Sequence, residues 1–189
     1  MKADLWLPVL KQELQGLGEA LLIWEIFRGD SFQCMLKPEI ALEKAILIKA
    51  KIKQFSVLDV RIGIGIGDIS YQSERITECN GTAFVNSGTS FDALKKYTLG
   101  LKTPWKEFDE PMGIMLQVAS FIMDSWSAKE SIFIYERLRS PDLSQKDLAQ
   151  RMQKSQSTVS DALKRSGYNE IEAVLEYYRK RVGKLCQSS

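Results

Sequence analysis

A chain of 189 residues, 44% of them apolar and 26% charged, has enough apolar side chains to bury the core of one domain or of two small ones. Its net charge of +2 gives no strong overall field for nucleic acid, and the lack of histidine excludes Ser-His pairs, Cys-His pairs and histidine metal ligands. The three cysteines form neither a disulfide framework nor a CxxC zinc motif. The sequence shows no membrane-spanning apolar run and no signal peptide, so we expect a cytoplasmic protein.

The first part of the chain predicts a helix, a strand hairpin and a second helix. Leucines recur at helical spacing over residues 5–17. The apolar run 20–27 and the alternating segment 31–36 predict two strands joined by the turn Arg28-Gly29-Asp30. Pro38 is expected to begin a helix that runs to Gln54. Its inward positions are Leu42, Ala45, Ile46 and Ile48.

A glycine-rich segment follows, and residues 59–67 predict the clearest strand, with Val60, Ile62, Ile64 and Ile66 on one face. On the other face Gly63, Gly65 and Gly67 leave room for a close approach. Their spacing is not that of a dinucleotide-binding loop, so close helix packing is the expected reason. Residues 82–96 predict part turn and part helix, and residues 97–101 a further strand that ends at Thr103-Pro104.

No strand pattern is present after Trp105. An amphipathic helix is expected to bury Met112, Met115, Val118, Ala119 and Ile122. Ser127 with Glu130 predicts a capping box for a helix that ends before Pro141, and Asn169 with Glu172 predicts the cap of a last helix. We therefore expect an α+β protein with an α/β domain at 1–104 and a helical domain at 105–189.

Residues 143–167 predict two short helices joined by a tight turn. Ser144 and Ser155 are suitable caps for the two helices, and Gly167 ends the second one. The expected inward residues are Leu148, Ala149, Met152, Val159, Ala162 and Leu163. This pattern resembles the helix-turn-helix of bacterial regulators and of the promoter-reading end of sigma factors. Gln153 stands where a turn glycine is common, and Asp161 puts a negative charge on the outer face.

Polar side chains at the start of the second helix are of the type that contacts bases and phosphates when a helix enters the major groove. The candidate DNA-binding residues are Lys154, Gln156, Ser157, Thr158, Ser160, Lys164 and Arg165. Residues 143–184 carry nine Lys and Arg against five Asp and Glu, which agrees with a module that contacts phosphate. A helical hairpin inside an ordinary bundle, with a solvated charged face, is the structural alternative.

The α/β part resembles the catalytic core of class III nucleotide cyclases and diguanylate cyclases through Arg28–Phe32, Arg61–Gly65 and Gly81–Asn86. Together with the helix-turn-helix, the chain resembles the SatD family. The resemblance implies a ferredoxin-like, cyclase-like fold in which Asp30 binds a metal and Asn86 stabilises the transition state. It also implies Mg²⁺ with a nucleotide ligand. From the residues alone, Asp30 is expected to be a turn residue. Asn86 is equally suited to be a helix cap or a site residue.

The chain differs from cyclases at residues that their catalysis requires. Two-metal phosphoryl transfer needs a second carboxylate to hold two cations about 3.5–4 Å apart. In cyclases that aspartate is on a strand before the first helix, and this strand is missing here. A truncated sequence or a late start codon would explain its absence. Ile26 occupies the position of the base-reading lysine, and Ser90 lies near that of the catalytic arginine. We therefore expect no active cyclase.

The function expected from the sequence is a DNA-binding transcriptional regulator that acts as a homodimer, with an N-terminal domain for dimerisation or ligand sensing. One alternative is a metal-dependent nucleotide-binding protein or degenerate cyclase that uses Asp30. The other is a protein–protein docking module, which Asp161 would suit. The identity of any cofactor stays open at this point.

Overall fold

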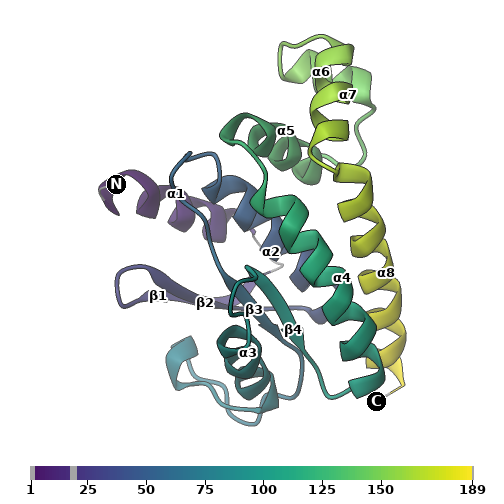
Figure 1. The fold of residues 1–189 in the computed structure, drawn as a ribbon. Helices are drawn as coiled ribbons and strands as arrows, with labels where there is room; N and C mark the ends of the chain where they lie inside the picture. The colour runs from purple at the N-terminus through teal and green to yellow at the C-terminus, as the bar shows by residue number, and fades with distance from the viewer. Residues whose placement is uncertain (1–2, 18–20, 189) are drawn as a thin grey trace.

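The computed structural model describes residues 3–17 and 21–188, which form a mixed α+β fold (Figure 1). The first part contains α1 (Ala3–Gly16), β1 (Leu21–Phe27), β2 (Ser31–Leu36), α2 (Pro38–Ile52), β3 (Ile62–Gly65), α3 (Thr82–Asp92) and β4 (Leu99–Lys102). The second part contains α4 (Lys106–Asp124), α5 (Ala128–Arg139), α6 (Gln145–Arg151), α7 (Gln156–Arg165) and α8 (Tyr168–Gln187). No described helix has the length and apolarity needed to cross a lipid bilayer.

The strands form two separate two-stranded sheets. β1 and β2 make the predicted antiparallel hairpin, in register from Ile23 opposite Met35 to Phe27 opposite Ser31. Its turn contains Arg28 and Gly29 with φ of 51° and 82°. Hairpin turns of the primed types require this left-handed backbone, and glycine adopts it without strain. β3 and β4 are parallel, with Ile62 opposite Leu99.

The glycines of β3 allow α3 to lie directly on the strand, as the sequence predicted. A Cβ atom on Gly65 would lie 2.2 Å from the carbonyl oxygen of Ala83, and one on Gly63 would lie 2.6 Å from the backbone nitrogen of Phe91. Figure 1 shows α3 on one side of the β3–β4 pair and α4 on the other. β3 is shorter than the predicted strand 59–67 because its partner β4 has only four residues.

The hydrophobic core is continuous across the predicted domain boundary near residues 103–110. α8 reaches back to the α/β part, where the hydroxyl of Tyr178 donates to the carbonyl oxygen of Pro38 at 2.6 Å. Arg179 of α8 also pairs with Glu43 of α2 at 2.6 Å. α4, α5 and α8 therefore pack on the α/β part, whereas α6 and α7 project at one end of the molecule (Figure 1).

Two predictions about the helical part were wrong. Val118 was expected to face inward, but it is 57% exposed, because α4 buries Phe108, Met112, Leu116 and Met123 against β4 and α8 instead. The N-cap of α8 is Gly167 rather than Asn169, since α8 already begins at Tyr168. The side chain of Glu172 accepts a hydrogen bond from the Tyr168 hydroxyl at 2.7 Å.

Candidate nucleic-acid interface

The two helices α6 and α7 form the predicted helix-turn-helix, and both predicted caps are confirmed. The Ser144 hydroxyl accepts from the backbone N–H of Asp147 at 3.1 Å, and the Ser155 hydroxyl accepts from that of Thr158 at 3.2 Å. Each cap satisfies a backbone donor that has no partner inside its helix. Gln153 has φ of 54° in the turn, so it adopts the left-handed conformation that glycine commonly supplies there.

The module is held to the rest of the chain through the buried faces of its helices. The buried residues are Leu148, Ala149, Val159, Ala162 and Leu163, as predicted, while Met152 is partly buried. At the end of α7, the indole N–H of Trp126 donates to the carbonyl oxygen of Ser166 at 2.8 Å. Gly167 takes φ of 65° directly against Ile122 of α4. The orientation of α7 is therefore fixed by the end of α4.

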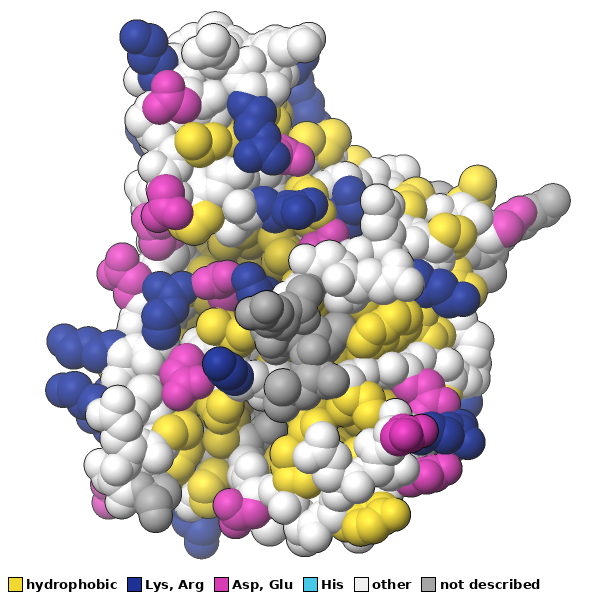
Figure 2. All heavy atoms as spheres, turned by 180° about the vertical axis from the view of Figure 1, so that it is seen from behind, with side chains coloured by type: hydrophobic (Ala, Val, Ile, Leu, Met, Phe, Trp, Pro, Cys, Tyr) yellow, Lys and Arg dark blue, Asp and Glu magenta, His cyan; other side chains and the backbone are white. Residues whose placement is uncertain are grey.

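The outer face of α7 presents most of the predicted DNA-binding residues to solvent. Lys154, Gln156, Ser157 and Lys164 are exposed, and Thr158 and Ser160 are partly exposed. Seen from behind, Lys and Arg side chains are distributed over this projecting end (Figure 2). The start of α7 combines short polar side chains with the positive end of a helix dipole, an arrangement suited to phosphate.

Two features of this face reduce its basic character. The Arg165 guanidinium lies 3.8 Å from the Glu130 carboxylate of α5, so part of its charge is directed toward the protein. Asp161 is exposed on the same helix, as expected. The hydrogen bond that the backbone N–H of Ser127 donates to Glu130 holds the pKa of this carboxyl below its usual range, and Arg165 contributes in the same direction.

Sequence reasoning missed the basic groove beside the module, which contains Lys129, Arg151 and Lys154 over apolar Ile132 and Met152. Arg151 is held in place, because it donates to the Ser140 hydroxyl at 2.6 Å and lies 3.5 Å from the Glu136 carboxylate. Lys129 is exposed in the first turn of α5. Lys129 and Lys154 thus add positive charge next to the start of α7.

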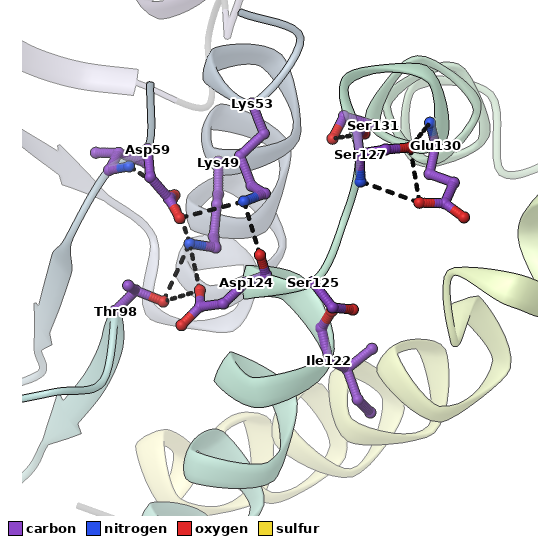
Figure 3. Close-up of polar contacts among 11 residues, drawn as sticks. Lys49, Lys53, Asp59, Thr98, Ile122, Asp124, Ser125, Ser127, Glu130 and Ser131 are labelled. Atoms are coloured by element: carbon purple, nitrogen blue, oxygen red, sulfur yellow. Dashed lines mark hydrogen bonds and ion pairs between the residues drawn. The ribbon is translucent and has the colours of Figure 1, made fainter. Parts of the chain in front are cut away.

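An ion cluster around the buried Lys49 joins α2 to the end of α4, and it was also missed (Figure 3). Lys49 is 1% exposed, and its ammonium group lies 2.6 Å from Asp59 and 2.8 Å from Asp124. Lys53 lies 3.3 Å from Asp59 and donates to the carbonyl oxygen of Asp124 at 3.0 Å. The signal in the sequence was the position of Lys49, seven residues after Leu42 on the inward face of α2.

A cavity of about 300 Å³ lies between β2 and β3. Its lining is mostly apolar, with polar Gln33 and Ser87 and with Lys37 as the one charged residue among the described residues that line it. Cys34 also lines the cavity, and burial raises the pKa of its thiol to about 11, so it stays protonated. Because β2 and β3 are not paired with each other, strand edges border the cavity on two sides.

The two residues that the cyclase resemblance singled out do not line this cavity. Asp30 is exposed at the tip of the hairpin, where the hydroxyl of Ser31 donates to its carboxylate. The amide of Asn86 donates to the carbonyl oxygen of Ile66 at 2.7 Å from within α3, which begins at Thr82, so Asn86 is not a helix cap. Across residues 3–17 and 21–188, no three His, Cys, Asp or Glu side chains gather closely enough to hold a metal ion.

Comparisons of the chain with protein-family models, with curated proteins and with solved structures found no match.

Proposed function

We propose that this chain is a DNA-binding transcriptional regulator that places α7 in the major groove. The observation that carries the proposal is the exposed polar start of α7, with Lys154, Gln156 and Ser157, at the projecting end of the molecule. In this proposal Gln156, Ser157, Thr158 and Ser160 contact bases or phosphates. The cations Lys154, Lys164 and Arg165 contact the DNA backbone, together with Lys129.

The α/β part has the proposed role of a sensor. Its apolar cavity between β2 and β3 suits an apolar or aromatic effector better than a nucleotide, because Lys37 is the only cation among its described lining residues and phosphates require several donors. The order of the elements, a hairpin, a helix, a glycine-rich strand and then a helix-turn-helix, also supports the proposal that the chain is a member of the SatD family with a cyclase-like α/β domain.

The proposal is tested by fluorescence anisotropy with a labelled mixed-sequence duplex at a low and a raised salt concentration. We expect salt-sensitive binding, since each phosphate contact contributes about −0.9 to the slope of log K against log salt. The Ser157→Ala, Lys164→Ala double variant should lower the affinity at least about tenfold, because it removes one phosphate charge and one hydroxyl contact.

The matched control is the Ser56→Ala, Lys106→Ala double variant, which removes the same chemical groups from exposed positions outside the module. It should bind as the native protein does. Absence of binding at low salt, or an equal loss in both double variants, would contradict the proposal and favour a protein-docking role for the module.

A further inference from the structure

α4 has an apolar face that no other part of the described chain, residues 3–17 and 21–188, covers. Ile114, Val118 and Phe121 are 62%, 57% and 79% exposed. Their spacing of four and three residues places them in one line along the helix, and Ser125 continues that line after a further four. We call Ile114, Val118, Phe121 and Ser125 the α4 seam. The opposite face of the same helix is buried in the core, so α4 is apolar on both sides.

We propose that the α4 seam is the surface through which two copies of this chain pair, with their α4 helices side by side and parallel. The inference rests on the proposed DNA-binding function, for which a single helix-turn-helix contacts too few base pairs for useful specificity. A second copy supplies the second recognition helix. The pairing also gives the exposed side chains of α4 an apolar partner.

The exposed area agrees with a dimer contact. At their exposures, Ile114, Val118 and Phe121 together present on the order of 350 Å² per chain, against about 800 Å² per partner in a standard interface. Three side chains thus provide nearly half of the required surface. Phe121, the most exposed of the three, has the size and character of an interface anchor.

The charge pattern favours a copy of the same chain as the partner. A two-fold axis brings a surface against itself, so a charged residue near the axis meets the same charge. All four residues of the seam are uncharged. Continued toward the start of α4, the line reaches exposed Glu107, which would face the Glu107 of the second copy. Two copies of the seam can therefore pack together without like charges meeting, except at the Glu107 end.

The direction of pairing follows from the position of the module. α4 runs toward α6 and α7, and Ile122 near its end lies against Gly167 at the junction of α7 and α8 (Figure 1). Parallel pairing places both recognition helices at one end of the dimer, where they can enter successive major grooves about 34 Å apart. Antiparallel pairing would place the two modules at opposite ends of the paired helices.

Sedimentation equilibrium without DNA tests the pairing. We expect the native protein to dimerise and Phe121→Glu to weaken the dimer at least about 100-fold, because it removes the anchor and places two like charges at the axis. Val85→Glu is the matched control, since Val85 is 64% exposed on α3, and it should leave the dimer unchanged. The urea midpoint of each variant verifies that it remains folded. A monomeric native protein, or a Phe121→Glu dimer of native affinity, would overturn the proposal.

Oxidative cross-linking tests the direction. In the parallel dimer the Ser125→Cys variant should form a disulfide between the two introduced cysteines, identified by mass spectrometry against the native protein as control. In an antiparallel dimer centred on Val118 the same residues lie about 20 Å apart, which excludes a disulfide. Glu107→Gln should tighten a parallel dimer. A dimer without the cross-link contradicts the parallel arrangement, whereas a native dimer that fails to bind DNA contradicts the proposed function alone.

Discussion

Replacing Lys49 by Met tests whether the ion cluster around this buried lysine stabilises the junction between α2 and α4. Met has a similar length and fills the same space, but it leaves the carboxylates of Asp59 and Asp124 without their ammonium partner. Asp59 keeps Lys53 at 3.3 Å, and Asp124 keeps the hydroxyl of Thr98 at 2.6 Å. The substitution therefore unpairs the two carboxylates only in part.

The expected loss of stability follows from how deeply each group is buried. Removing one partner of a buried ion pair costs roughly 3–5 kcal/mol, because a charge is left without compensation. Here the side chains of Asp59 and Asp124 are 35% and 34% exposed, so water can partly replace Lys49. We expect Lys49→Met to lower the free energy of unfolding by about 2–3 kcal/mol. With a slope of about 2 kcal/mol per molar urea, the midpoint falls by about 1 M.

Equilibrium unfolding in urea, followed by tryptophan fluorescence and by circular dichroism, measures this loss. The double variant Lys49→Met with Asp124→Asn is the control, because it removes the lysine together with one of its two carboxylate partners and leaves the Lys53–Asp59 pair intact. It should regain more than half of the lost stability, as neutral replacements of buried ion pairs often do. A loss below about 1 kcal/mol for Lys49→Met, or a double variant less stable than the single one, would refute the reasoning.

Two further predictions concern the helical part of the chain. Gln153→Gly should raise the free energy of unfolding by about 0.5–1 kcal/mol, because residue 153 has φ of 54°, and a lower urea midpoint would contradict this. The pKa of Glu130 is lowered in the folded protein, chiefly by the hydrogen bond that the Ser127 N–H donates to its carboxylate. The ionised Glu130 therefore contributes its full stabilisation above the ordinary pKa of 4.5. This stabilisation is lost as the pH falls through the lower pKa of the folded protein. The difference in urea midpoint between the native protein and Glu130→Gln should therefore close on acidification; a difference that persists at low pH would show that the ionised carboxylate is not what stabilises the cap.

The features that sequence reasoning predicted well are local ones. The caps of α6 and α7 depend on Ser144 and Ser155 and on backbone groups three residues away, so they can be read from a short segment. The same holds for the capping box of Ser127 and Glu130 and for the hairpin turn at Gly29. The departure noted at Gln153 also had a local meaning, since this residue takes the left-handed backbone in the turn.

The ion cluster could not be predicted in the same way, because its members are distant in the chain. Lys49 meets Asp59 ten residues later and Asp124 from the end of α4. The inward position of Lys49 on α2 indicated that a buried cation would need partners, but not which carboxylates would supply them. That choice depends on how α4 packs on β4, and this packing is a property of the whole fold.

α4 illustrates why periodicity alone assigns a helix but not always its buried face. Val118 and Ala119 are adjacent and both apolar, and the helix carries one apolar line through Met112, Leu116 and Met123 and a second through Ile114, Val118 and Phe121. A pattern with two apolar lines is equally compatible with either face toward the core. The core selects the line that fits β4 and α8, and the other line is left on the surface. This second apolar line has the spacing at which two helices pack side by side, and it carries no charge. Pairing of two copies through α4 requires both properties.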